Sequence, residues 1–318
     1  MQDRMDVETN QTLSQALQVR YTKLLFMLEL LEDTVLPKNK VSALRGGMGE
    51  MLLQMNCIRD RKCESCDFES ECLVQRTMYS KYEIKPVFLT AGESIGYVLE
   101  CDNYQEKFMA GEVLEFQMIL FGKTIVYFNQ FMQAFTMLGI VGLGKEQAKF
   151  RICSVMNQRK KLIVDEESLN LENYCIQTVG NYVEYRMAQI SERGLQNRVV
   201  FHTPTTIKYQ NEYMQEFQVG PLTEALKRRI YMLDCFEGIE SNLREFQFAL
   251  PEILEQKHDF SLVKRYSNRK NARMELKGIR GYVVTSEMGE DFLELLLAGE
   301  LVHVGKHTSF GFGKYTVR

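Results

Sequence analysis

The C-terminal end of the chain most constrains its fold, because a loop rich in glycine and lysine runs there directly into a strand-like segment. Residues 303–318 have the sequence HVGKHTSFGFGKYTVR. Glycine lets a backbone turn sharply and approach other groups closely, and the N–H groups and lysines of such a loop suit phosphate oxygens. A weaker copy, GIVGLGK, occupies residues 139–145 and precedes another strand-like segment. This repetition predicts two related domains in tandem.

The composition is that of an ordinary globular chain, with 45% hydrophobic and 25% charged residues among 318. The net charge of −3 gives no overall nucleic-acid signature, so any such site has to be a local basic patch. The polar first 19 residues lack a signal-peptide pattern, and no apolar run reaches the roughly 18 residues that cross a bilayer. We therefore expect a cytoplasmic protein with no membrane partner.

Apolar periodicity predicts the order β-α-β-β-α-β in each half of the chain, which is the ferredoxin-like order. In the first half the segments are residues 21–31 (strand or helix by pattern alone), a helix over 42–55, strands over 87–99 and 113–120, a helix over 125–138 and a strand over 149–154. In the second half they are a strand over 199–207, a helix over 222–236, a hairpin over 271–284 turning at Gly278 to Gly281, a helix over 290–298 and a strand over 312–317. The predicted fold class is α+β, with tandem ferredoxin-like (RRM-like) domains and a small cysteine-rich metal-binding insertion.

The domain boundaries follow from these elements. Residues 1–155 are predicted to form the N-terminal domain, with the cysteine insertion at about 57–76. A charged stretch over 156–172, which contains Asp165-Glu166-Glu167, is predicted as the linker. Residues 173–318 then form the C-terminal domain, which ends in the glycine-rich loop.

Four of the eight cysteines cluster at Cys57, Cys63, Cys66 and Cys72. The central C-x-x-C has the spacing at which two sulfurs meet one tetrahedral ion, and polar residues fill the gaps, so the stretch cannot build an apolar core. We predict a structural Zn²⁺ site without an open position for water. An iron–sulfur cluster is the second choice. The alternative without a metal is a loop with four reduced thiols.

A basic stretch over residues 264–280 holds seven lysines and arginines against the single acid Glu275. Basic residues with an interleaved tyrosine suit an RNA backbone and its bases, whereas most charge runs are simply solvated surface. Because the rest of the chain is acidic, we favour RNA binding. The predicted contacts are Arg265, Arg269, Lys270 and Arg273.

In these motifs the chain resembles the CRISPR-associated endoribonucleases that process precursor CRISPR RNA, within the repeat-associated (RAMP) superfamily, and the subgroup with a four-cysteine insertion. The resemblance covers nearly all of the chain beyond about residue 20. It is carried by Gly281-Tyr282-Val283, Gly299-Glu300, residues 303–306 and 310–315, Leu44-Arg45-Gly46, the four clustered cysteines, Leu138-Gly139, Gly142-Leu143-Gly144, Phe201, Thr203-Pro204 and Arg228-Arg229.

The resemblance implies two ferredoxin-like domains that hold a CRISPR repeat RNA, with CRISPR effector or adaptation proteins as further partners. It also implies metal-independent cleavage, in which the 2′-hydroxyl attacks the phosphate and leaves a 2′,3′-cyclic phosphate and a 5′-hydroxyl. This chemistry needs a base, an acid and a cation. The loop contacts to RNA are predicted at Gly305, Gly311, Gly313 and Lys314.

The candidate catalytic residues are His303, His307, Lys306 and Arg45. Histidine suits acid–base work near neutral pH, although His303 could instead brace the loop. The first helix carries Arg45 but no histidine, where relatives of this family often place one. A RAMP subunit that binds CRISPR RNA without cutting it is therefore the alternative function, and a zinc-stapled scaffold without RNA is a third.

Overall fold

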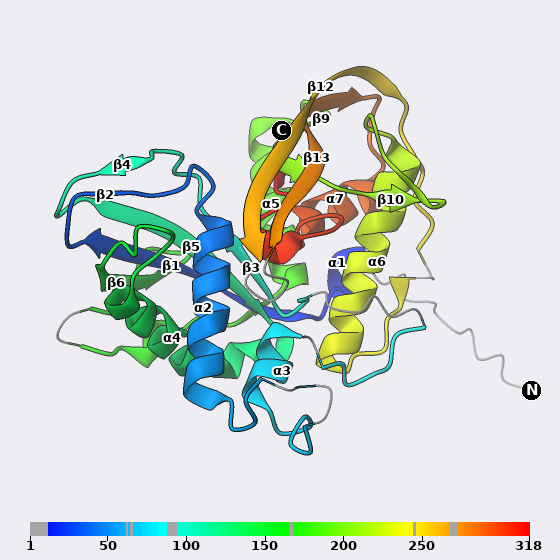
Figure 1. Ribbon diagram of the computed structural model, residues 1–318. Coiled ribbons are helices and arrows are strands. Elements are labelled where there is room, and N and C mark those ends of the chain that lie inside the picture. The colour runs from blue at the N-terminus through cyan, green and yellow to red at the C-terminus, as the bar shows by residue number, and fades with distance from the viewer. Residues whose placement is uncertain are drawn as a thin grey trace, which may run out of the picture.

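A computed structural model gives the structure of the chain and describes residues 12–61, 63, 66–79, 81–87, 94–165, 168–243, 246–267 and 272–318. The chain has two halves, each built around an antiparallel sheet (Figure 1). The main elements of the N-terminal half are β1 (Arg20–Leu30), α2 (Val41–Asn56), β3 (Tyr97–Glu100), β5 (Val113–Phe121), α4 (Phe128–Val141) and β6 (Phe150–Asn157).

The C-terminal half repeats this order. Its main elements are β9 (Arg198–Thr205), α6 (Val219–Glu237), β12 (Ile253–Ser267), β13 (Ala272–Thr285), α7 (Glu290–Val302) and β14 (Tyr315–Val317). The two sheets have the strand orders β3-β5-β1-β6 and β12-β13-β9-β14, so the first strand of each half lies between the third and the fourth. The predicted fold class, α+β with tandem ferredoxin-like domains, is confirmed.

The remaining elements join or flank these units. They are the helices α1 (Leu13–Ala16), α3 (Leu73–Met78) and α5 (Val179–Arg193), the 3-10 helices η2 (Gly122–Tyr127), η3 (Leu171–Asn173) and η5 (Thr308–Phe310), and the strands β2 (Thr34–Val35), β4 (Lys107–Phe108), β7 (Leu162–Val164), β8 (Gln177–Thr178), β10 (Lys208–Tyr209) and β11 (Glu212–Tyr213). β7 extends the N-terminal sheet beside β6, within the stretch predicted as the linker. The domain boundaries themselves stay a prediction.

The burial of β1 decides between strand and helix for residues 21–31. Leu24, Phe26, Leu28 and Leu30 are buried, and the residues between them are half-buried. Side chains alternate across a strand with a period of two, so these four residues share one face of the sheet. They pack in a common core with residues of α2 and α4.

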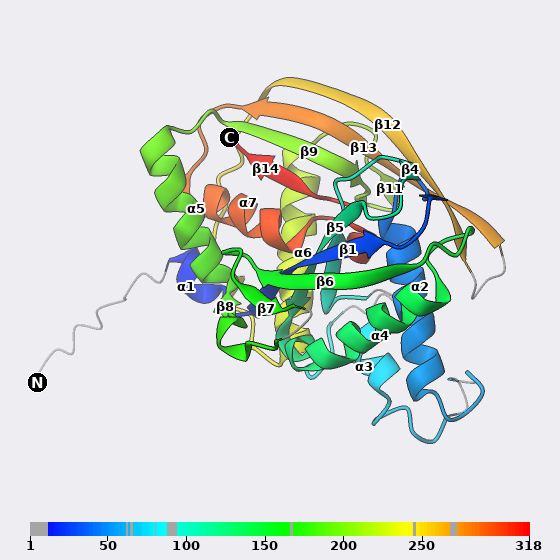
Figure 2. The same cartoon turned by 90° about the vertical axis from the view of Figure 1, so that its left-hand side faces the viewer.

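A second core joins the two halves. It contains Tyr21 and Phe121 from the N-terminal sheet together with Leu226 of α6 and Leu297 of α7. α7 is buried from Phe292 to Val302, as expected of a helix that is apolar all round. Figure 2 shows α7 between the C-terminal sheet and strands β1 and β6 of the N-terminal sheet. The two halves therefore pack as successive layers, with α6 and α7 covering a face of both sheets.

The apolar stretch Gly122–Val141 is long and apolar enough to cross a membrane by length and composition alone, with 44% of it buried. Its Phe131 and Phe135 have no exposed surface and pack against Phe26 and other residues of the N-terminal core. The stretch is thus a core element of this fold.

The predicted hairpin over residues 271–284 is wrong, because these residues form the single strand β13, which pairs with β12 along its length. Gly278 and Gly281 do not form a turn. Their missing side chains allow the backbones of neighbouring strands to approach closely. An added Cβ would lie 2.8 Å from Thr205 N at Gly278 and 2.0 Å from Lys257 O at Gly281. β12 and α5 were not predicted, because β12 is polar and interrupted by charges and α5 lay near the predicted linker.

Candidate RNA site at the junction of the two halves

The glycine-rich loop, residues 303–315, lies where the two halves meet. It leaves α7, forms the short helix η5 and enters β14. An added Cβ at Gly311 would lie 2.7 Å from the carbonyl oxygen of Leu99 in β3. Phe310 of η5 lies under Arg45 of α2, with the guanidinium carbon 4.1 Å from the ring centroid. The loop is therefore held against both β3 and α2 of the N-terminal half.

The loop glycines have a structural reason of their own. Gly305, Gly311 and Gly313 have φ values of 82°, 76° and 72°, a region that residues with a side chain rarely adopt. An added Cβ would lie 2.4 Å from Thr206 O at Gly305 and 1.9 Å from Val304 O at Gly313. These glycines thus allow the loop to pack on its own backbone, whereas their predicted contacts with RNA stay predictions.

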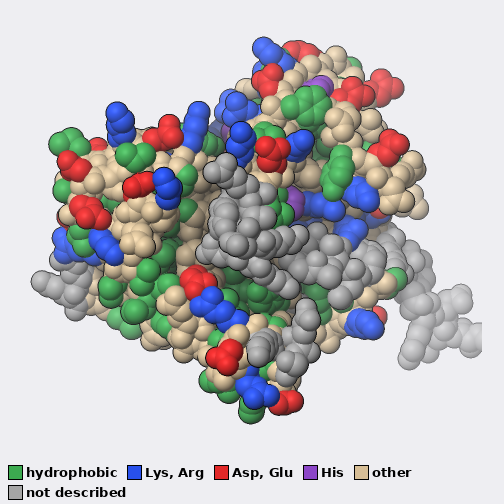
Figure 3. Space-filling model, viewed as in Figure 1, with side chains coloured by type: hydrophobic (Ala, Val, Ile, Leu, Met, Phe, Trp, Pro, Cys, Tyr) green, Lys and Arg blue, Asp and Glu red, His purple; other side chains and the backbone are tan. Residues whose placement is uncertain are grey.

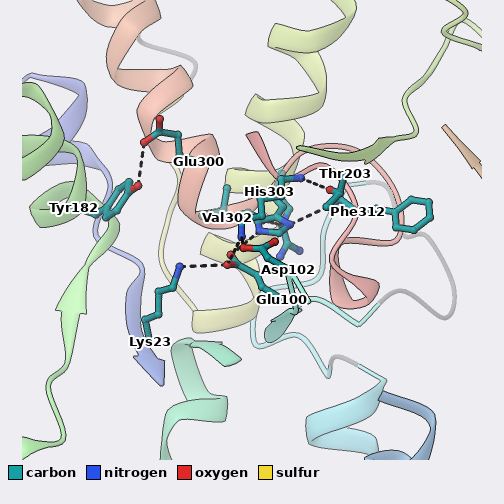
Figure 4. A network of polar contacts seen from close by, with 11 residues as sticks. Lys23, Glu100, Asp102, Tyr182, Thr203, Glu300, Val302, His303 and Phe312 are labelled. Atoms are coloured by element: carbon teal, nitrogen blue, oxygen red, sulfur yellow. Dashed lines mark hydrogen bonds and ion pairs between the residues drawn. The ribbon is translucent and has the colours of Figure 1, made fainter. Parts of the chain in front are cut away.

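His303 lies beneath the loop, with no solvent-exposed surface. Its Nδ1 is 2.9 Å from the carbonyl oxygen of Phe312, and its Nε2 is 2.9 Å from Oε1 of Glu100 in β3 (Figure 4). A carbonyl oxygen and a carboxylate only accept hydrogen bonds, so both ring nitrogens donate and the ring has the bonding pattern of an imidazolium. His303 therefore ties the loop to the N-terminal half and does not face solvent.

Glu100 is the centre of a buried charge network. Its Oε2 is 3.1 Å from Lys314 Nζ and 3.4 Å from Lys23 Nζ, and Lys314 Nζ is also 2.7 Å from Asp102 Oδ2 (Figure 4). Burial alone would raise the pKa of Glu100, but the charge of Lys23 and the hydrogen bond and charge of His303 outweigh it and hold the pKa well below its usual value. Lys314, predicted to bind RNA, is thus engaged with Glu100 and Asp102.

Sequence reasoning missed Glu100, although a glutamate that closes the otherwise apolar strand Tyr97–Glu100 was a usable signal. Such a residue needs a partner, because a buried carboxylate is costly unless it is paired and hydrogen-bonded. Its partners come from β1 and from the loop, which are far apart in the chain. No pattern in the sequence predicts that pairing.

Arg45 is the predicted catalytic residue that contacts the glycine loop from the N-terminal half. It is half-buried on α2, and its Nη2 donates to Ser94 Oγ at 2.9 Å. Its Nε donates to Ser309 Oγ of the loop at 3.2 Å, and its guanidinium lies over Phe310. Sequence reasoning missed Ser94 and Ser309. The guanidinium is a fixed positive charge between α2 and the glycine loop.

Lys306 and His307 are half-exposed at the outer side of the loop. Lys306 Nζ is 5.6 Å from the ring centroid of Tyr213 in β11, within the range of a cation–π contact. The His307 ring packs edge-on against Phe312, with centroids 5.8 Å apart. The structure thus separates the two predicted histidines, since His303 is internal and His307 reaches the surface.

The predicted basic patch lies on the ribbon formed by β12 and β13. Arg269 and Lys270 lie outside the described residues, and Arg265 and Arg273 are placed only by their backbone, in the pairs Arg265↔Met274 and Tyr266↔Arg273. The described Lys264, Lys277 and Arg280 are exposed. Figure 3 shows basic and acidic side chains side by side over this upper part of the molecule. RNA binding by the four predicted residues stays a prediction.

The four clustered cysteines are all free thiols, and they line one pocket of about 300 Å³ between α2 and α3. Within the described part of the chain, no three His, Cys, Asp or Glu side chains stand close enough together to hold a metal ion. The zinc prediction is therefore neither confirmed nor excluded by the positions of these residues.

The fold and the loop define a class of protein with two ferredoxin-like halves and a glycine-rich loop packed between them. Residues 199–315 match the family described as CRISPR-associated endoribonuclease Cas6. Residues 17–175 match a family named AF_1859_N, described as an N-terminal domain. The N-terminal half of the chain thus belongs to the AF_1859_N family, and its C-terminal half is similar to the Cas6 endoribonucleases. A search of the curated proteins found no match.

Solved structures of Cas6 proteins share the fold. A partial Cas6-RT-Cas1–Cas2 complex is 12% identical with a TM-score of 0.54, over 95% of this chain and 46% of that chain. The Cas6-RT-Cas1–Cas2 complex gives the same identity, TM-score and coverage of this chain, over 29% of that chain. A Cas6 product complex is 12% identical with a TM-score of 0.49, over 94% and 99% of the two chains. The chain thus spans less than half the length of the first two.

Proposed function

We propose that this protein is an endoribonuclease that cleaves precursor CRISPR RNA within its repeats. The observation that carries the proposal is the glycine loop of the Cas6 domain, which is seated against the N-terminal half at Arg45. The half-exposed His307 of the loop packs edge-on against the same Phe310 ring, with centroids 6.4 Å apart, and Lys306 precedes it in the chain. A phosphate, a cation and an acid–base group would thus meet at one place.

The proposed reaction needs no metal in its chemical step. The 2′-oxygen attacks the scissile phosphorus and gives its proton to a base, while the P–O5′ bond breaks and an acid protonates the leaving 5′-oxygen. The products are a 2′,3′-cyclic phosphate and a 5′-hydroxyl. Guanidinium stays charged at all working pH values and binds phosphate oxygens in a fork, so we assign Arg45 to the charge that develops on phosphorus.

We assign His307 the acid–base role, because it is half-exposed at the loop and histidine is the side chain suited to proton transfer near neutral pH. Lys306 is the second cation. His303 is assigned a positioning role, because its buried ring spends both nitrogens on Phe312 and Glu100. The sequence named both loop histidines as candidates, and the burial of His303 is our reason for favouring His307.

The second candidate function is a subunit that binds CRISPR RNA without cutting it. Two observations favour it: α2 carries Arg45 but no histidine, and the loop histidine His303 is buried. In either function repeat RNA is the proposed main partner. Solved complexes with this fold contain Cas6 together with RT, Cas1 and Cas2, so CRISPR adaptation proteins are proposed as further partners.

Single-turnover cleavage of a labelled repeat RNA tests the assignment. Arg45→Ala and His307→Ala should each lower the rate by about 10²–10⁴-fold with little change in RNA affinity. Arg193→Ala, at the exposed end of α5, and His258→Ala, on β12, are the matched controls and should cleave at close to the wild-type rate. Wild-type rates in both loop-site variants would exclude these roles.

A further inference from the structure

The segment from Cys57 to Cys72, which connects α2 to α3, is folded around its thiols. Among its described residues only the four cysteines are half-buried, and every other side chain is exposed. Even Ile58 and Phe68, its large apolar residues, are 73% and 50% exposed. A segment of this length without an apolar core needs another source of order.

The four thiols meet at one pocket. Cys57 follows the last residue of α2, and Cys72 precedes the first residue of α3, so both ends of the segment are fixed by helices. Cys63 and Cys66 lie on a turn between them, with Cys66 N 3.3 Å from Cys63 O. All four line the same cavity of about 300 Å³.

The backbone also turns toward one of the thiols. Asp60 and Arg61 have φ values of 50° and 64°, a left-handed conformation that folds the chain back toward Cys57. As a result the Arg61 N–H donates to Cys57 Sγ at 3.3 Å. Hydrogen bonds to the ligands of a metal site orient them toward the ion, so this contact suits a ligand role for Cys57.

We propose that Cys57, Cys63, Cys66 and Cys72 bind one zinc ion through four thiolates. Two pairs of sulfurs around one cavity, one pair in a C-x-x-C turn, match the donor set and spacing of a structural zinc site. No three of the described side chains stand close enough together to hold a metal ion, so binding would draw the sulfurs together. Binding releases the thiol protons, and four protein ligands leave no position for water.

The ion would fix the N-terminal end of α3, which supports the junction site. Met78 closes α3, and an added Cβ at Gly49 of α2 would lie 2.7 Å from its terminal carbon. The carbonyl oxygen of Met78 accepts a hydrogen bond from Ser94 Oγ, and Ser94 in turn accepts from Arg45. The zinc site thus has a structural role, which does not depend on RNA cleavage.

Elemental analysis of the full chain, purified without chelators, tests the proposal. We expect about one zinc per chain in the wild type. The double substitution Cys63→Ser with Cys66→Ser should lose it. The matched control, Cys153→Ser with Cys175→Ser, removes two thiols from outside the segment and should retain it. Absence of zinc, iron in its place with visible absorption, or zinc retained by the first variant would overturn the proposal.

Alkylation of the wild type gives an answer that does not depend on the folding of a variant. With zinc bound, the four segment cysteines should resist iodoacetamide, and they should react after the metal is removed by a strong chelator. Peptide mass spectrometry identifies the modified residues. Rapid alkylation of all four in zinc-containing protein would place the metal elsewhere and contradict the proposal.

Discussion

At the scale of single residues, the junction site depends on charges that are buried and paired. Glu100 lies in the N-terminal half, and its partners His303 and Lys314 lie in the C-terminal half. Both contacts therefore connect the two halves. Removing one partner of such a group leaves an uncompensated buried charge, which costs more than the pair contributes. Residues of this network should therefore be more important for stability than for the chemical step.

We predict that His303→Ala lowers the free energy of unfolding by about 2–4 kcal/mol, because it removes two buried hydrogen bonds and one of the three partners of Glu100. His307→Ala, at a half-exposed position, should change it by less than about 1 kcal/mol. Urea unfolding at neutral pH measures both. A positioning role also predicts that His303→Ala keeps the pH midpoint of cleavage. Unchanged stability with a shifted pH profile would instead make His303 the acid or base.

Asp234 of α6 gives a prediction on pH. Its burial raises its pKa from 3.8 to about 7, and the negative charge of Glu237 acts in the same direction. Between these two values the folded state binds more protons than the unfolded state, so this residue lowers stability as pH rises from about 4 to 7. Asp234→Asn should therefore gain stability relative to wild type over that range, by about 1–3 kcal/mol. Thermal melting at pH 5 and pH 8 measures the gain, and an equal difference at both would contradict it.

At the scale of elements, success of the sequence-based prediction depended on whether an element carries its own pattern. The helix predicted over 125–138 is found as α4, from Phe128 to Val141, whereas residues 21–31, which fitted a strand or a helix, needed the structure to show the strand β1. β12 is predominantly polar because it is the edge strand of its sheet, so no alternation indicated it. The glycines of β13 were interpreted as turn residues. Their real role, the close approach of two backbones, has no sequence signature of its own.

The glycine loop gives a matched pair of substitutions. Gly311→Val puts a branched side chain at φ 76° and 2.7 Å from Leu99 O, so we expect a loss of at least about 2 kcal/mol and weaker RNA binding. Gly46→Ala, on the exposed face of α2 with no atom within 4 Å of the new Cβ, should add about 0.5–1 kcal/mol. Thermal melting compares them. A stable Gly311→Val protein would show that the loop is not packed as described.

The ribbon should carry the salt dependence of RNA binding. We predict weaker RNA binding when glutamine replaces Arg265, Arg269, Lys270 and Arg273. The slope of log K against log salt concentration should fall by about 1 for each phosphate contact that is lost. A control set removes equal charge from exposed positions of the N-terminal half: Lys145, Arg159, Lys160 and Lys161. Binding isotherms at several salt concentrations measure the slope. Equal effects of the two sets would mean that the ribbon does not bind the RNA.

At the scale of the whole molecule, the site exists only because the two halves share a core. Tyr21 and Phe121 of one half pack with Leu226 and Leu297 of the other, and this contact brings the glycine loop onto α2. The local sequence pattern predicted both domains and the loop. The shared core could not be predicted, because it depends on which face of each sheet its own half leaves uncovered. For the same reason the burial of His303 could not be predicted, since it follows from α7 lying between the sheets.

The central claim is that this molecule cuts CRISPR repeat RNA at the junction of its halves. The most direct measurement incubates the wild-type protein, in excess, with end-labelled repeat RNA in EDTA and determines the ends of the products. We predict one cut within the repeat, a 2′,3′-cyclic phosphate on the upstream product and a 5′-hydroxyl on the downstream one. Repeat RNA that is tightly bound but stays intact would contradict the claim and leave the RNA-binding subunit as the function.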